Sequence, residues 1–251
     1  MFEINFKLTF ERIIANIIRC NPEYTFDIYA HGWAPENIKE DIVTKLKREH
    51  NVRSVSIKLE SQLNFNDIYA QIENKSYILN DISQYHTNFK ANQKNKEFMF
   101  QHFKNSLSYA YSIQKSCEQV DDSYDVYISL RWDLHVAVPI IFKKLDMNKV
   151  HVNKERGPSP IFIGDFILIS KTNLLQKFYD EVLFLMIKDS SKIEAWYKYY
   201  KSKQHHFPNK RFDLSCYTNQ GLYTYYLYVQ NVQYEKIAHS LACSRLKTRI
   251  Q

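Results

Sequence analysis

The sequence predicts a single α/β domain whose mostly parallel central sheet is flanked by helices. Two β-prone runs near the start, residues 25–33 and 52–60, alternate with stretches of helical periodicity at 10–20 and 35–50. Strands that alternate with helices are typical of parallel sheets covered on both faces. At 251 residues the chain is long enough for one large core, so we expect one domain over residues 1–251.

The first four elements follow from local patterns. Segment 10–20 carries apolar residues at helical spacing and is followed by Asn-Pro, which ends a helix. The run 25–33 closes with His-Gly-Trp, so it predicts a strand followed by a turn. Segment 35–50 is charged, with a proline at its start, and predicts a surface helix. Residues 52–60 alternate in polarity as a strand does.

The rest of the chain continues the alternation of strands and helices. Residues 61–96 are polar and rich in Asn, so they predict loops and short helices. The later elements are a long helix at 96–120, a strand at 124–130, a short helix and polar turn within 137–150, an apolar segment at 161–170, helices at 171–187 and 219–232, and a possible edge strand at 231–237.

Charge and composition limit the class of protein. The formal net charge of +7 favours a polyanionic partner, namely nucleic acid, a phosphorylated sugar donor or an anionic membrane surface. Lysines are spread along the chain, and zinc-finger and RNP patterns are lacking, so we do not expect a nucleic-acid partner. The four cysteines form no CxxC pair, and no apolar run is long enough for a membrane span. The start of the chain also lacks the pattern of a signal peptide, so we expect a soluble, cytoplasmic protein.

Polar side chains follow two of the predicted strands, at the edge where α/β sheets bind ligands. Arg131 and Asp133 lie two apart on an extended chain and therefore point to one side, where they could hold a phosphate and a divalent cation. The plainer interpretation is an Arg–Asp ion pair at the strand end. His31 and Trp33 could line a pocket, although packing is the commoner role of such residues.

Asp165 follows Gly164 inside the apolar segment 161–170. A carboxylate there needs a partner, or its pKa rises, and a raised pKa suits a general base. A turn at Gly-Asp with the Asp capping a helix is an equally good interpretation. With four glycines the chain has no phosphate-binding Gly-rich loop, and it has no GxSxG or HExxH motif. These absences exclude nicotinamide dehydrogenases, P-loop kinases, common hydrolases and zincins.

Four stretches in order resemble one known family. They are KLTFERIIANII followed by FDIYAHGW, LSYAYSIQKSCE leading to YDVYISLRWDL, then IGDFILISKTNLL, and finally LYTYYLYVQN. The chain is similar in these stretches to the small GT-A fold glycosyltransferases of large DNA viruses and of bacterial capsule and lipopolysaccharide clusters. The resemblance implies a GT-A-like, Rossmann-like single domain that uses a nucleotide-sugar donor and a glycan or glycoprotein acceptor.

The resemblance also implies roles for particular residues. Asp133 would hold Mn²⁺ or Mg²⁺ at the donor diphosphate, with Arg131 beside the phosphates, and Asp165 would be the general base of an inverting reaction. Further nucleotide contacts are implied for Lys7, Thr9, Ser112 and Lys115. Trp132 stands where the family usually has Pro, and the motif offers one carboxylate where a full DxD has two.

We therefore expect a nucleotide-sugar-dependent glycosyltransferase. The alternative is a non-catalytic binding module of degenerate transferase fold that holds an anionic ligand or nucleic acid through its positive charge. A nuclease that uses Asp133 and Asp165 is a weaker possibility, because such sites usually cluster more carboxylates.

Overall fold

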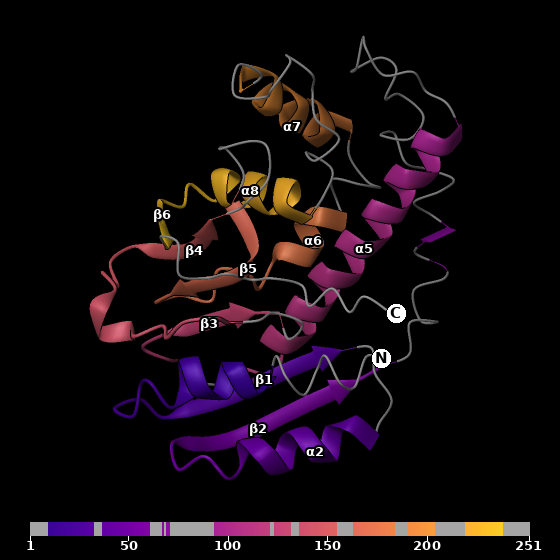
Figure 1. The fold of residues 1–251 in the computed structure, drawn as a ribbon. Helices are drawn as coiled ribbons and strands as arrows, with labels where there is room; N and C mark the ends of the chain where they lie inside the picture. The colour runs from indigo at the N-terminus through magenta and orange to yellow at the C-terminus, as the bar shows by residue number, and fades with distance from the viewer. Residues whose placement is uncertain are drawn as a thin grey trace, which may run out of the picture.

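The computed structural model gives the chain a mixed α/β fold (Figure 1). The structure describes residues 10–32, 37–60, 67, 69–70, 93–120, 123–131, 136–154, 163–183, 190–203 and 219–237. Within these residues one sheet has two strands and the other has four. In this described part, no helix is long and apolar enough to cross a membrane.

The two-stranded sheet is formed by the first part of the chain. A helix begins at Phe10 and continues as the π-helix η1 (Ile14–Ile18), followed by β1 (Phe26–Gly32), α2 (Asn37–Leu46) and β2 (Val52–Leu59). β1 and β2 are parallel, with Ala30 opposite Ile57. Apolar side chains of both helices and both strands share one buried cluster, which holds Phe10, Ile14, Ile18, Ala30, Ile42, Leu46 and Ile57. These four elements confirm the predicted order.

The four-stranded sheet is mixed, with the order β3-β5-β4-β6. Its strands are β3 (Tyr127–Leu130), β4 (Val150–Lys154), β5 (Ile163–Ser170) and β6 (Tyr234–Ile237). β5 runs antiparallel to both β3 and β4, whereas β4 and β6 are parallel. The α/β class is confirmed, but the expected mostly parallel arrangement does not hold for this sheet, because β5 reverses direction between two strands that run the same way.

Hydrogen bonds join the start of β3 to the start of β1. The phenol of Tyr124 donates to Asp27 Oδ2 at 3.0 Å, and Tyr29 and Tyr124 share a hydroxyl–hydroxyl bond of 2.7 Å. Phe26 of β1 packs on Phe142 with ring centroids 6.1 Å apart. The amino ends of β1 and β3 therefore lie together, and strand direction carries their carboxyl ends toward the same region (Figure 1).

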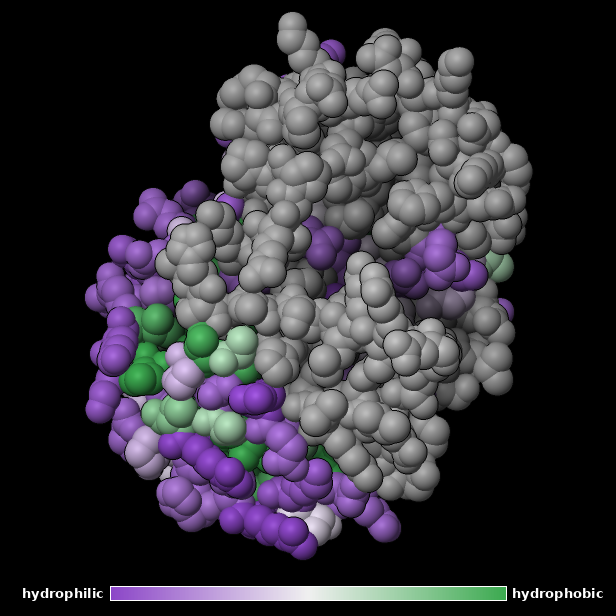
Figure 2. All heavy atoms as spheres, in the orientation of Figure 1, coloured by the Kyte–Doolittle hydropathy of each residue, from purple (hydrophilic) through white to green (hydrophobic). Residues whose placement is uncertain are grey.

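Four helices cover the larger sheet or run beside it. They are α5 (Gln93–Cys117), α6 (Phe178–Leu183), α7 (Ser190–Ser202) and α8 (Asn219–Val229). Their buried side chains form the largest apolar cluster, which includes Leu107, Ala110, Ile113, Phe178, Trp196, Tyr200, Leu222 and Tyr223. The long helix α5 reaches from this cluster down to β1 (Figure 1). On the face drawn in Figure 2, the described residues are mostly hydrophilic, with small hydrophobic areas between them.

The short helix predicted within 137–150 is the 3-10 helix η3 (Phe142–Lys144), and the polar turn predicted after it is closed by the hydrogen bond from Lys149 N to Asp146 O at 2.9 Å, just before β4. The buried side chain of Asn21 donates to Ile140 O at 2.7 Å and accepts from Phe142 N at 2.8 Å. These backbone groups are bound to a side chain from the segment that follows η1, so they form no further helical hydrogen bond and η3 stays short.

The remaining elements match the predictions in part. α5 confirms the long helix, α8 confirms the helix at 219–232, and β6 confirms the edge strand because it pairs with β4 alone in the described sheet. The apolar segment predicted at 161–170 forms the strand β5 over Ile163–Ser170, so the interpretation of Gly164 and Asp165 as a turn before a helix is wrong. Of the predicted helix at 171–187, residues 171–177 form turns and Phe178–Leu183 form α6, while residues 184–187 lie outside the described part. The helix α7 was not predicted.

Candidate functional site

The candidate site lies where β1, β2 and β3 end. His31 is the penultimate residue of β1, Glu60 directly follows β2, and Arg131 directly follows β3. Gly32 pairs with Leu59, so β1 and β2 end side by side. Carboxyl ends of strands are the usual ligand-binding edge of α/β sheets.

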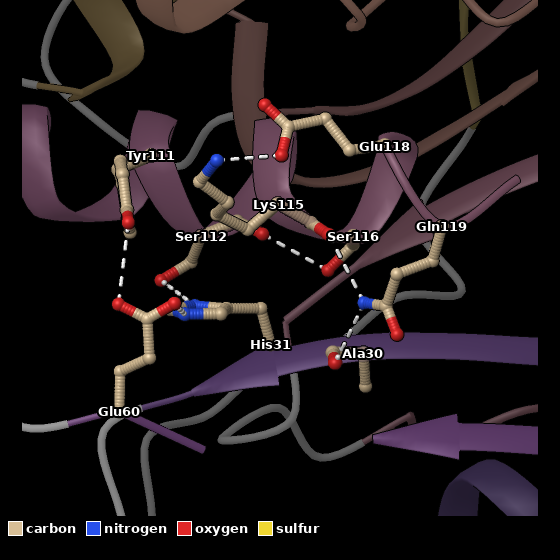
Figure 3. A network of polar contacts seen from close by, with 9 residues as sticks. All are labelled: Ala30, His31, Glu60, Tyr111, Ser112, Lys115, Ser116, Glu118 and Gln119. Atoms are coloured by element: carbon tan, nitrogen blue, oxygen red, sulfur yellow. Dashed lines mark hydrogen bonds and ion pairs between the residues drawn. The ribbon is translucent and has the colours of Figure 1, made fainter. Parts of the chain in front are cut away.

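One stripe of α5 faces these strand ends. Tyr109, Ser112 and Lys115 are spaced three apart, which places them along one side of a helix. Ser112 Oγ lies 3.1 Å from Nδ1 of His31 (Figure 3). The guanidinium of Arg131 lies 5.7 Å from the ring centroid of Tyr109, within the range of a cation–π contact. The stripe therefore touches the end of β1 and the end of β3.

His31 forms the buried centre of the site. Its side chain has no exposed surface, and its Nε2 lies 3.3 Å from Glu60 Oε1, while Glu60 is 27% exposed. Burial lowers the pKa of His31, which outweighs the opposite effect of the Glu60 charge. The ring is therefore held toward its neutral form, with one nitrogen facing a carboxylate and the other facing a hydroxyl.

Tyr111 completes the contacts of Glu60. Its hydroxyl donates to Glu60 Oε2 at 3.2 Å, and its ring meets the His31 ring edge to face at 5.4 Å. Burial, followed by the charge of Glu60, raises the pKa of Tyr111 to about 12. The phenol therefore keeps its proton and acts as a donor, and each oxygen of Glu60 faces one residue of the network (Figure 3).

Lys115 brings a positive charge to the edge of this network. Its ammonium group lies 2.6 Å from Glu118 Oε2 and 5.4 Å from the Tyr111 ring centroid. The Lys115 side chain is 31% exposed. An exposed ion pair of this kind contributes about 0–1 kcal/mol to stability. Lys115 can therefore exchange Glu118 for an anionic ligand at little cost to the fold.

Gln119 fixes the end of α5 against the sheet. Its amide donates to Ala30 O at 3.2 Å (Figure 3). The same amide accepts from Ser56 Oγ at 2.7 Å, so Gln119 joins the helix to both strands. Ser112 and Lys115 lie within two turns of this anchor. Their positions over the strand ends are thus set by hydrogen bonds as well as by packing.

An irregularity in β5 lies beside the end of β3. Between the pairs Val152–Leu168 and Lys154–Ile163, β4 advances two residues and β5 advances five. The three extra residues of β5 form a bulge, a feature that often occurs next to active sites. Leu130 pairs with Ile167, so this bulge falls at the end of the sheet where β3 stops.

The buried side chain of Asn153 holds the bulge in place. Its Oδ1 accepts from Ile167 N at 3.0 Å, and a Cβ at Gly164 would come within 1.7 Å of its Nδ2. Glycine at 164 therefore lets the two strands approach closely. Asp165 belongs to this bulge by its backbone, and its side chain lies outside the described residues.

The structure brings together three of the predicted site residues. Ser112 and Lys115 share the helix stripe, and Arg131 contacts that stripe through Tyr109. Lys7, Thr9 and Asp133 lie outside the described residues, as does Trp33. The predicted phosphate and metal pair of Arg131 and Asp133 therefore stays a prediction.

Sequence reasoning missed Glu60 and Tyr111 and gave His31 a packing role first. A signal for Glu60 was present, because it is the last residue of the predicted strand 52–60 and shares the strand-end position of His31. Tyr111 gave no such signal, since aromatic residues are frequent along the whole helix. Among the residues that the structure describes, no three His, Cys, Asp or Glu side chains gather as metal ligands would.

Comparison of the chain with protein-family models, with curated proteins and with solved structures finds no match. Similarity thus assigns no family, and the function has to be inferred from the residues and their geometry.

Proposed function

We propose that the chain is a glycosyltransferase that moves a sugar from a nucleotide-sugar donor to a glycan or glycoprotein acceptor. The observation that carries the proposal is the meeting of His31, Glu60 and Arg131, at three strand ends, with the Ser112 and Lys115 stripe of α5. A nucleotide sugar needs both hydrogen-bonding groups for its hydroxyls and cations for its diphosphate. This site offers both within one region.

The cations suit the leaving group of the proposed reaction. Breaking the bond between the anomeric carbon and phosphate builds positive charge on the sugar and negative charge on the nucleotide. Lys115 and Arg131 would stabilise the negative charge, because charge-assisted bonds to phosphate are strong. The formal net charge of +7 favours an anionic donor for the same reason.

The acceptor hydroxyl needs a base, and Asp165 is our proposal for it. The β5 bulge carries the backbone of Asp165 near the point where β3 ends, because Leu130, the last residue of β3, pairs with Ile167. One carboxylate base is sufficient if the reaction inverts the anomeric centre. A GT-A-like arrangement and an inverting outcome are both parts of this proposal.

A divalent metal is the remaining part of the proposed chemistry. The described residues contain no ready cluster of ligands. By the resemblance, a Mn²⁺ or Mg²⁺ ion would be held by Asp133 together with oxygens of the diphosphate, a donor set that suits a hard cation. When bound, such an ion would neutralise charge on the leaving phosphates. Lys115 and Arg131 would act at the same phosphates as side-chain cations.

Thermal unfolding against nucleoside diphosphates and nucleotide sugars, with and without Mn²⁺, tests the proposal, because a ligand of the native state raises the midpoint. Release of free sugar from each donor is measured in parallel. We expect one nucleotide to raise the midpoint, and its sugar conjugate to be hydrolysed slowly in a manner that Asp165→Asn abolishes.

A matched pair of lysine variants places the ligand. Lys115→Gln should weaken binding of that nucleotide roughly tenfold, the loss of one charge-assisted bond to phosphate. Lys149→Gln removes the same charge at the opposite edge of the sheet, just before β4, and should leave binding unchanged. If no nucleotide binds, and binding to a polyanion falls steeply with salt, the non-catalytic binding module replaces the transferase.

A further inference from the structure

The network around His31 determines which atoms Ser112 can present to a ligand. His31 has Glu60 Oε1 at 3.3 Å from Nε2 and Ser112 Oγ at 3.1 Å from Nδ1. A neutral imidazole carries one N–H, and its other nitrogen is an acceptor. The hydrogen-bonding role of Ser112 therefore depends on which nitrogen of His31 holds the proton.

Glu60 fixes the position of that proton. An ionised carboxylate offers only acceptor oxygens, and its negative charge 3.3 Å from Nε2 favours the tautomer of His31 that carries its hydrogen on that nitrogen. Tyr111 donates to the other oxygen of Glu60 at 3.2 Å and keeps the carboxylate aimed at the ring. Nδ1 is then an acceptor, and the Ser112 hydroxyl has to donate its hydrogen to it.

A serine hydroxyl that has given its hydrogen away keeps only two lone pairs. We propose that Ser112 is held as an acceptor by His31 and Glu60, so that this position binds a ligand hydroxyl or N–H group and rejects phosphate oxygen. His31 and Glu60 are positioning residues in this arrangement. Ser112 is half-buried and Glu60 is 27% exposed, so the network borders the surface that a ligand would reach.

The site thus divides into two parts with different chemistry. Ser112 and Glu60 present acceptors, while Lys115 and Arg131 present cations. The inference rests on the proposed function for the identity of the ligand, a nucleotide sugar. Its ribose hydroxyls, or an N–H of its base, would lie at Ser112, and its diphosphate would lie at the cations.

The proton position is measured directly by ¹⁵N NMR of the protein labelled in its histidines, with His31→Gln used to assign the signal. At pH 7.5 we expect the tautomer protonated at Nε2. In Glu60→Gln, Tyr111 still donates to the oxygen of the new side chain, and this bond turns the amide N–H₂ toward the His31 ring. Nε2 of His31 then faces a donor, so we expect the tautomer to change to Nδ1–H. An Nδ1–H tautomer or an imidazolium in the wild-type protein would overturn the inference, whether or not any nucleotide binds.

The ligand group is identified by a double-substitution cycle. The probes are UDP, ADP, GDP and CDP, their 2′-deoxy and 3′-deoxy forms, base-N-methylated forms where the base carries an N–H, and inorganic pyrophosphate. We expect Ser112→Ala to weaken one nucleoside diphosphate roughly fivefold and pyrophosphate not at all.

The loss of binding free energy should be no larger when the ligand donor and the Ser112 hydroxyl are both removed than when either is removed alone. Both changes delete the same hydrogen bond. The deoxy forms reveal a ribose hydroxyl, and the N-methylated forms reveal a base N–H. Equal weakening of pyrophosphate by Ser112→Ala would show a phosphate contact and would contradict the inference. If no probe binds at all, the proposed function fails, and the tautomer of His31 still decides the role of Ser112.

Discussion

The two ends of β1 carry polar networks of different kinds. At the start, the side chain of Asp27 is 2% exposed and its carboxylate accepts from Arg53 Nε and Nη2, from Ser54 Oγ at 2.7 Å and from Tyr124 OH at 3.0 Å. At the end, Glu60 is 27% exposed and faces Tyr111 and His31.

The two networks differ in how many acceptor positions of the carboxylate remain for a ligand. A carboxylate has about four lone-pair positions, and the four bonds to Asp27 fill them. Glu60 has two contacts among the described residues and keeps accessible surface. We infer that the first network stabilises the fold and that the second is available for binding.

Removing the negative charge of Asp27, near the start of β1, tests whether the first network stabilises the fold. Asp27→Asn should lower the free energy of unfolding by roughly 3 kcal/mol, because the new amide N–H₂ faces donors and two charge-assisted bonds are lost. Urea unfolding measures the change. A loss below about 1 kcal/mol would show that the saturated carboxylate adds little to the fold.

Acid titration tests the same carboxylate without a mutation. The hydrogen bonds from Arg53 lower the pKa of Asp27 to about 2, from 3.8 in its ordinary environment. A lowered folded-state pKa means that the stabilisation is complete above pH 4 and is lost as the pH falls through 2, a change of about 2 kcal/mol. Unfolding free energies at pH 2–5 should show this loss in the wild-type protein. Asp27→Asn should lack that part of the slope.

The matching carboxylate-to-amide substitution at Glu60 tests whether the second network contributes less to the stability of the fold. Glu60→Gln should change the free energy of unfolding by less than about 1 kcal/mol, since the side chain is part exposed and the amide can still accept from Tyr111. The same urea experiment measures it beside Asp27→Asn. A loss as large as that of Asp27→Asn would mean that both networks serve the fold alike.

The smallest effect we expect concerns His31. Burial lowers its pKa, so below the ordinary value of 6.5 the unfolded state binds protons that the folded state does not. Its contribution to stability is therefore complete above that pH and declines as the pH falls. His31→Gln should flatten the pH dependence of the unfolding midpoint between pH 7 and 5. An unchanged slope in His31→Gln would contradict a neutral, buried ring.

Helices and strands that carry a clear pattern of apolar residues could be predicted from the sequence alone. The apolar periodicity of segments 10–20 and 96–120 predicted two helices. The strand at 25–33 followed from a short β-prone run, and the strand at 52–60 followed from alternation. The polar residues at the strand ends were visible too, because a strand stops where its apolar run stops. Motif resemblance added Ser112 and Lys115, which the structure places at these same strand ends.

Which of these side chains lie in contact depends on the tertiary structure and could not be predicted from the sequence. His31, Glu60 and Ser112 are brought together by the parallel register of β1 and β2 and by the anchoring of α5 through Gln119. The antiparallel direction of β5 and its bulge likewise depend on partners far away in the chain. Local periodicity indicates which face of an element is apolar. The direction and register of strand pairing are set by contacts between distant residues, and these contacts determine which side chains form the site.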